Sequence, residues 1–277
     1  MCRWLAYSGT PVLLESLLYE PEHSLIDQSL HARMGVETTN GDGFGVGWFG
    51  PEMRTPAVVR EIGPAWSNRS LREIAGHVRS PLFFAHIRAS TGSAVQQTNC
   101  HPFRHGRWMW MHNGAVEDFD RVRRDLALAV DPALFTRIEG STDSELMFFL
   151  ALTFGLEEDP PGAVARMAWL VERAGRERGV RHPLQMTVAV TDGVRLWTFR
   201  YSSRGASRSL YYSSRVETLR ALHPGTAFLR EASARTRLVV SEPLGDLPGV
   251  WNEVPEGSCG IVRPEGDALL PFAPLPV

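Results

Sequence analysis

The chain has 277 residues and a formal net charge of −2, with 43% hydrophobic and 22% charged residues, which is the composition of an ordinary globular protein. The near-neutral charge lacks the basic excess of a nucleic-acid-binding protein, and the longest apolar run, around residues 146–156, is shorter than the ~20 residues of a membrane-spanning helix. Because the start of the chain also lacks the unbroken apolar stretch of a signal peptide, we expect a cytoplasmic protein with no nucleic-acid or membrane partner.

Short runs of alternating or β-branched residues predict strands along much of the chain. The first, residues 3–8, meets the turn-forming Gly9, Thr10 and Pro11. The others are residues 44–49, 82–87, 108–111, 185–190, 195–199, 210–212 and 237–241. Because few residues connect several of these runs, antiparallel pairing is favoured over a parallel array.

Apolar residues spaced three and four apart predict helices at residues 70–78, 117–129 and 142–174, the last divided in two at residues 159–161. Residues 200–208, rich in Ser and Arg, are expected to form an exposed loop, and residues from about 264 to 277 an irregular tail. Runs of strands with helices grouped between them indicate an α+β fold with helices on the outer faces of sheets.

Four glycines alternate with other residues at positions 41, 43, 45 and 47. This segment leads into a strand and not into a helix, so it does not match the dinucleotide-binding fingerprint. The pattern instead predicts positive φ angles or the close approach of another part of the backbone.

The three cysteines, Cys2, Cys100 and Cys259, have no paired spacing, and the nine histidines form no metal-binding motif. We therefore expect neither a disulfide framework nor a metal or other cofactor. Cys2 is the most informative of the three. If Met1 is removed, the thiol lies beside a free α-amine, whose pKa of ~7.7 to 8.0 suits a base that deprotonates it. Taken alone, Cys2 fits a small packed hydrophobic residue better than a nucleophile.

A thiol that attacks an amide needs hydrogen-bond donors for the oxyanion that develops. Asn113 can supply its side-chain amide and Gly114 an unshielded backbone N–H, directly after the strand predicted at residues 108–111. On its own, however, Asn-Gly is first a turn signal.

A substrate with an amino-acid head group needs a cation for its carboxylate and an anion for its ammonium. Arg88 follows the strand predicted at residues 82–87, and its planar guanidinium suits a carboxylate, while Ser90 and Thr91 could add hydroxyl donors. Asp143 could bind the ammonium, but it also lies in a capping box before an apolar helix. Singly, Arg88 and Asp143 fit surface or cap positions better than ligand positions.

Together and in this order, these motifs resemble the class II glutamine amidotransferases, a family of N-terminal-nucleophile hydrolases. The resemblance covers about the first 150 residues. Its motifs are Cys2, residues 40–43 (NGDG), 86–88 (HIR), 99–103 (NCHPF), 112–114 (HNG) and 141–145 (STDSE).

The resemblance implies a role for each motif. Cys2 would be the nucleophile with its α-amine as base, and Asn113 with Gly114 would form the oxyanion hole. Arg88, Ser90, Thr91 and Asp143 would bind the glutamine head group. Asn40, Asp42, His86 and His112 would support the walls of the site, as would His101. The implied fold is one αββα sandwich of two mainly antiparallel sheets, spanning residues 1–277 as a single domain without a synthase domain.

Three functions remain open from the sequence. The first is a stand-alone amidase acting on glutamine, with ammonia passed to a separate synthase, or on a γ-glutamyl amide, as in the small γ-glutamyl hydrolases of ergothioneine biosynthesis. The second is an inactive module that binds an amino acid. The third is a papain-like hydrolase that pairs Cys100 or Cys2 with a histidine. The oligomeric state is not predicted.

Overall fold

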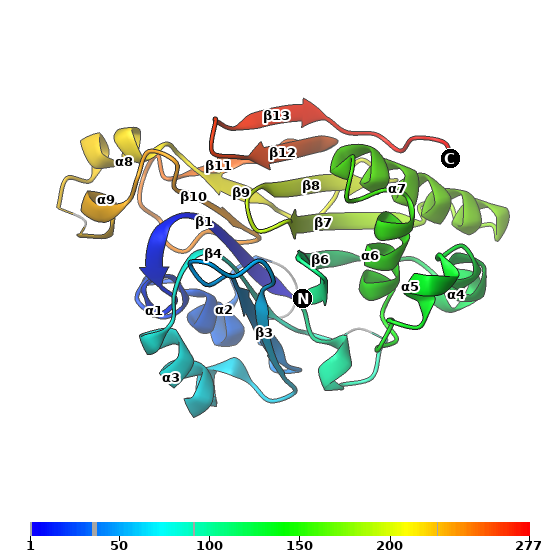
Figure 1. Ribbon diagram of the computed structural model, residues 1–277, viewed down its shortest axis with the longest axis horizontal. Helices are drawn as coiled ribbons and strands as arrows, with labels where there is room; N and C mark the ends of the chain where they lie inside the picture. Colours follow the sequence, from blue (N-terminus) through cyan, green and yellow to red (C-terminus); the bar gives the residue numbers. More distant parts are fainter. Residues whose placement is uncertain (1, 35–37, 91, 226) are drawn as a thin grey trace.

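Two antiparallel sheets form the framework of the computed structural model, which describes residues 2–34, 38–90, 92–225 and 227–277. Over these residues, one sheet has seven strands and the other has six (Figure 1). In spatial order the first consists of β11 (Trp251–Glu253), β9 (Tyr211–Ser213), β10 (Arg237–Val240), β1 (Arg3–Leu13), β4 (Arg79–Ile87), β2 (Phe44–Trp48) and β3 (Ala57–Glu61). The second consists of β13 (Ala268–Pro271), β12 (Ser258–Val262), β8 (Leu196–Ser202), β7 (Leu184–Thr191), β6 (Trp108–Val116) and β5 (Phe103–His105).

Helices cover the outer face of each sheet (Figure 1). The helices in the described part of the chain are α1 (Glu15–Leu18), α2 (Leu25–His31), α3 (Arg69–His77), α4 (Phe119–Leu128), α5 (Pro132–Phe135), α6 (Asp143–Thr153), α7 (Pro160–Glu177), α8 (Val216–Leu222) and α9 (Ala227–Glu231). One apolar cluster joins α1, α2 and α3 to the seven-stranded sheet, a second joins α4, α6 and α7 to the six-stranded sheet, and a third lies between the sheets. The predicted α+β fold with two antiparallel sheets and outer helices is confirmed.

The strand β1 occupies the middle of its sheet, where Leu5 pairs with Ala85 of β4 on one side and with Val240 of β10 on the other. Its side chains alternate, as in any strand. Trp4 and Ala6 enter the core between the sheets, whereas Leu5 and Tyr7 pack toward the helices. The parity of a residue on β1 therefore decides whether it faces the second sheet.

The prediction that β1 ends at Gly9 is wrong, because the strand continues to Leu13. The pairing with β4 shifts register between Ser8 and Val12, so the segment that reads as a turn is an irregularity within one strand. Proline is tolerated at such positions, since its missing N–H costs no ladder hydrogen bond there.

Two segments expected to be irregular are partly strand. The tail contains β13, in which Leu270 pairs with Cys259 of β12, and a proline at the end of an edge strand disturbs no inner ladder. In the loop expected at residues 200–208, β8 continues to Ser202, and the largely buried Arg200 forms an ion pair with Glu253 at 2.6 Å. Among the helices described, none is long and apolar enough to cross a membrane.

Candidate active site

Three strands bring the expected functional residues to the space between the sheets. Cys2 directly precedes β1. It lies two residues before Trp4, so its side chain, like that of Trp4, faces the second sheet. On β4, His86 shares the parity of the inward-facing Phe84, and on β6, Asn113 shares that of Met111. The alternation of side chains along each strand therefore points residues that are far apart in the sequence into the same space between the two sheets.

A pocket of about 590 Å³ opens at this point. Most of the residues expected at the site line it: Cys2, Arg88, Ser90, His101, His112, Asn113, Gly114 and Asp143. Asn40, Asp42 and His86 lie behind this lining and not on it. Thr91 lies outside the described residues.

The thiol of Cys2 is held against the backbone at the end of β4. Its Sγ accepts a hydrogen bond from the Ala89 N–H at 3.3 Å and lies 3.4 Å from the Ala89 carbonyl oxygen. Burial raises the pKa of the Cys2 thiol, against the opposing effects of the Ala89 N–H and the Arg88 charge. A neighbouring base is therefore needed to generate the thiolate.

Asn113 is fixed from both sides. Its Nδ2 donates to the Cys2 carbonyl oxygen at 2.9 Å, and its Oδ1 lies 3.1 Å from His86 Nε2. An amide nitrogen carries two hydrogens, so Nδ2 keeps a second one for another acceptor in the pocket. The amide of Asn113 is therefore oriented before any substrate enters.

The reading of Asn113-Gly114 as a turn signal is wrong, because both residues lie inside β6 and pair with β7. Gly114 has a φ of +146°, and a Cβ placed on it would lie 1.9 Å from the Gln185 carbonyl oxygen. Glycine is thus required here by backbone conformation and by crowding from the neighbouring strand.

Arg88 is buried, with 3% of its surface exposed. Its Nη2 donates to Ser93 Oγ at 2.8 Å, to the Ala94 carbonyl at 3.0 Å and to Ser90 Oγ at 3.3 Å. Over the described part of the chain these partners are neutral oxygens and none is a carboxylate. A buried cation without an acidic partner is costly, so this side of the pocket favours an anion.

Ser90 lines the pocket and also makes contacts within its own loop. Its hydroxyl donates to the Ser93 carbonyl at 2.5 Å, and its backbone N–H donates to Asp42 Oδ2 at 2.7 Å. Asp42 also donates its own N–H to the Arg88 carbonyl at 3.1 Å. Ser90 and Asp42 therefore shape the loop around Arg88.

Asp143 begins α6 at the rim of the pocket. Its Oδ2 accepts from the Val116 N–H at 2.8 Å and its Oδ1 from the Ser144 N–H at 2.7 Å. Thr142 caps the helix as predicted, since its Oγ1 accepts from the Glu145 N–H at 3.1 Å. Because each carboxylate oxygen can accept more than one hydrogen bond, Asp143 can keep these two backbone contacts and still bind a ligand.

The glycine segment permits the close approach expected of it. Gly43 has a φ of +121°, and a Cβ on Gly45 would lie 2.1 Å from the His101 carbonyl oxygen. Asn40, just before this segment, is buried and donates from Nδ2 to the Gln28 carbonyl at 3.3 Å. These residues allow β2 to pack directly under the loop that carries His101.

Three buried histidines surround Asn113. The rings of His86 and His101 stack at 4.2 Å, and His112 Nδ1 lies 2.8 Å from Ser144 Oγ. Burial lowers the pKa of His86 to about 3, and burial also lowers the pKa values of His101 and His112. A ring that weakly basic is a poor base for a thiol, which disfavours a Cys–His mechanism.

Cys100 is fully buried and does not line the pocket.

The free energy of unfolding is expected to decrease as the pH falls below about 6.5. In the unfolded chain His86 takes up a proton near pH 6.5, whereas in the folded protein it does so near pH 3. Between these values the unfolded state binds more protons, which costs ~1.4 kcal/mol of stability per pH unit for each such histidine. Urea unfolding at pH 7.5 and pH 5 measures this slope, which His86→Gln should make shallower. Equal slopes for the two proteins would contradict the assignment.

Some pocket residues were not predicted from the sequence. Asp118, Arg121 and Arg123 line it from the start of α4, and Arg208 lines it from the segment before β9. Arg121 pairs with Asp118 at 3.1 Å. These side chains come from segments without a recognisable motif, and only the folded chain brings them together.

The chain is similar to known proteins over most of its length. The family model described as glutamine amidotransferases class-II matches residues 20–269. The "Probable glutamine amidotransferase DUG3" of Saccharomyces cerevisiae is 34% identical over 305 residues, which covers 98% of this chain and 84% of that protein.

Two further proteins are similar over nearly their whole length. The gamma-glutamyl-hercynylcysteine sulfoxide hydrolase of Mycolicibacterium smegmatis is 27% identical, and the alignment covers 99% of this chain and 100% of that protein. The solved structure of a glutamine aminotransferase class-II domain protein from Silicibacter pomeroyi is 35% identical and superposes with a TM-score of 0.75, covering 99% of this chain and 100% of that one.

Proposed function

The chain belongs to the class II glutamine amidotransferase family, whose members act on C–N bonds, and we propose that it hydrolyses γ-glutamyl amides through a γ-glutamyl thioester on Cys2. The observation that carries this proposal is the convergence of Cys2, Asn113, Arg88 and Asp143 on one pocket. Their chemistry matches what such a reaction requires: a nucleophile, an oxyanion donor, a cation and an anion.

The glutamyl head group binds between two charges. Arg88 holds the α-carboxylate, because its buried guanidinium otherwise faces neutral oxygens alone. Asp143 holds the α-ammonium from the start of α6, where its carboxylate is already fixed by the Val116 and Ser144 N–H groups. These two contacts direct the γ-carbonyl toward Cys2.

The base is the α-amine of Cys2, which becomes available when Met1 is removed. It takes the thiol proton, and the sulfur then forms a bond to the γ-carbonyl carbon. The Asn113 Nδ2 and the Gly114 N–H hold the resulting oxyanion. As the C–N bond breaks, the leaving amine receives the proton from the α-ammonium. Water then attacks the thioester, which releases glutamate and restores the thiol.

The shape of the pocket favours a leaving group larger than ammonia. Its volume of about 590 Å³ falls within the ~300–1,000 Å³ of sites for drug-sized ligands. From Gly114 it continues to α4 and to Arg208, so there is room beyond the reacting carbon. This outer part is lined by Arg121, Arg123 and Arg208 against Asp118 and Asp120, so its charge is positive on balance and suits a leaving group that carries a carboxylate. A reducing compartment such as the cytoplasm suits a free catalytic thiol.

The test compares leaving groups. We expect kcat/KM to rise from glutamine to γ-glutamylmethylamide and to be highest for γ-glutamylglycine. Arg123→Gln and Arg208→Gln should each lower the value for γ-glutamylglycine by about 1.4- to fivefold, because exposed charge pairs contribute ~0.2–1 kcal/mol. Arg124→Gln is the matched control, since Arg124 is exposed on the same helix but does not line the pocket. A preference for glutamine would instead indicate ammonia supply to a separate synthase.

A further inference from the structure

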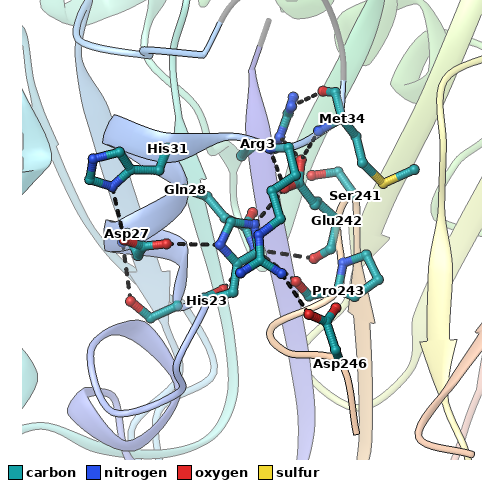
Figure 2. Close-up of polar contacts among 12 residues, drawn as sticks. Arg3, His23, Asp27, Gln28, His31, Met34, Ser241, Glu242, Pro243 and Asp246 are labelled. Atoms are coloured by element: carbon teal, nitrogen blue, oxygen red, sulfur yellow. Dashed lines mark hydrogen bonds and ion pairs between the residues drawn. The ribbon is translucent and has the colours of Figure 1, made fainter. Parts of the chain in front are cut away.

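The residue after Cys2 takes part in a buried ionic network on the other face of β1 (Figure 2). Arg3 donates from Nε to Glu242 Oε2 at 2.7 Å, and the two side chains are 2% and 1% exposed. Because side chains alternate along a strand, Arg3 points toward the helices while Cys2 faces the second sheet. The ion pair therefore lies directly behind the proposed nucleophile.

Glu242, just after β10, is held by further donors. Its Oε1 accepts from the Arg33 N–H at 2.8 Å and lies 2.5 Å from His23 Nε2, while its Oε2 also accepts from the Met34 N–H at 3.0 Å. Burial acts to raise the pKa of Glu242, but the hydrogen bonds from His23 and Arg33 and the Arg3 charge hold it below its ordinary value. The carboxylate is therefore an ionised, fixed anchor.

Arg3 uses its remaining donors on the backbone next to the site. Its Nη1 donates to the Cys2 carbonyl oxygen at 3.0 Å, and its Nη2 donates to the Met34 carbonyl. The Cys2 carbonyl therefore receives two hydrogen bonds, one from Arg3 and one from Asn113 at 2.9 Å. The Arg3 hydrogen bond comes from the helix-facing side of β1, and the Asn113 hydrogen bond comes from β6 of the other sheet.

Such an anchor matters because the first residue of a mature chain has no preceding residue to hold it. Terminal residues are poorly ordered unless they are tied down. With Met1 removed, Cys2 is restrained by its one peptide bond, by the Ala89 contact to its sulfur and by the two hydrogen bonds to its carbonyl. The α-amine nitrogen and the carbonyl carbon of Cys2 are bonded to the same Cα. The position of the α-amine therefore depends on how firmly the carbonyl is held.

We propose that Arg3 and Glu242 are positioning residues, which fix the Cys2 backbone so that its α-amine and sulfur keep a reactive geometry. This inference rests on the proposed role of Cys2. Glu242 holds the guanidinium, the guanidinium holds the Cys2 carbonyl, and a residue near the end of the chain thereby orients the nucleophile at its start. Neither side chain lines the pocket, so substrate binding does not involve them directly.

The experiment uses Arg3→Lys in the full-length protein. Lysine keeps the charge, but a single ammonium cannot reach Glu242, the Cys2 carbonyl and the Met34 carbonyl in the same geometry. We expect kcat for γ-glutamyl amides to fall about 100-fold, the size expected for a displacement near 1 Å, with KM little changed. The rate at which iodoacetamide alkylates Cys2, followed by mass spectrometry, should fall with it.

The matched control is Arg237→Lys. Arg237 on β10 also has a buried guanidinium, which pairs with Asp267 at 2.5 Å and donates to backbone carbonyls, but it does not line the pocket. The control should lower the melting temperature without changing kcat. A loss of melting temperature in Arg3→Lys equal to that of the control, with wild-type kcat and alkylation rate, would overturn the proposal.

The pH profile separates charge from position. Arg3→Met removes a positive charge beside Cys2, so the acid limb of kcat/KM should move to higher pH, whereas in Arg3→Lys the limb should stay in place while kcat falls. Glu242→Asp serves as the test if Arg3→Lys does not fold. This change withdraws the carboxylate by one methylene. A lowered kcat in Glu242→Asp supports the proposal, and an unchanged kcat overturns it. A wild-type protein inactive on every γ-glutamyl amide would refute the proposed function, and the alkylation rates would still test the positioning.

Discussion

Replacing Cys2 by alanine is expected to reduce kcat on the order of 10⁶-fold, to the background rate, because the variant has no atom that can form the thioester. The fold should persist, since the Cys2 side chain is only partly buried and its sulfur contacts the Ala89 backbone. Turnover of γ-glutamyl amides, the melting temperature and ligand binding by calorimetry together measure the change. We expect the variant to bind substrate with nearly wild-type affinity.

The control for this variant is Cys100→Ala. Cys100 is fully buried outside the pocket, so its removal should lower the melting temperature and leave kcat near that of the wild type. Intact mass shows whether Met1 has been removed, and a fusion with an uncleavable N-terminal tag should be as inactive as Cys2→Ala. Full activity in either the tagged protein or Cys2→Ala is incompatible with an α-amine mechanism. A wild type that binds glutamate but turns over nothing indicates a binding module.

Replacing Asn113 by aspartate is the second change with a large expected effect. The carboxylate can still accept from His86 Nε2, but it has no N–H for the Cys2 carbonyl or for an oxyanion. Loss of one oxyanion donor costs about 10²–10³ in kcat, and the negative charge beside the oxyanion adds to that loss. We expect kcat to fall by at least this factor, measured at saturating substrate.

Asn113→Ala provides the comparison. It removes the donor without adding charge, so its kcat should fall by about 10²–10³ and lie above that of Asn113→Asp. KM should change little in both variants, because the proposed ligands of the head group, Arg88 and Asp143, are retained. A large increase in KM with constant kcat would place Asn113 in substrate binding and leave the oxyanion hole to other groups.

Much of the site could be predicted because it depends on short motifs at strand ends and helix starts. Arg88 follows β4, Asp143 begins α6, and Cys2 precedes β1, and each position is visible as a change of pattern in the sequence. The order of these motifs then indicated the family, and the resemblance implied a role for each of them. The helix cap at Thr142 was predicted correctly for the same reason, since its contacts are local.

What could not be predicted depends on contacts between distant segments. Asn113-Gly114 reads as a turn, and it is the crowding by the Gln185 carbonyl on β7 that explains a glycine inside β6. The hydroxyl of Ser90 is taken by the Ser93 carbonyl, which no spacing reveals. Likewise, Glu242 lies 239 residues from its partner Arg3, so no local pattern could have joined them.

The central place of β1 in its sheet bears on how the enzyme matures during synthesis. One edge of β1 pairs with β10, whose residues are made near the end of translation. At about 5–20 residues per second, the ribosome needs on the order of 10–50 seconds to produce the chain that separates them. Throughout that interval this strand edge and its Arg3 anchor lack their final partner, so the first residues stay accessible to an aminopeptidase, whose removal of Met1 the proposed mechanism requires.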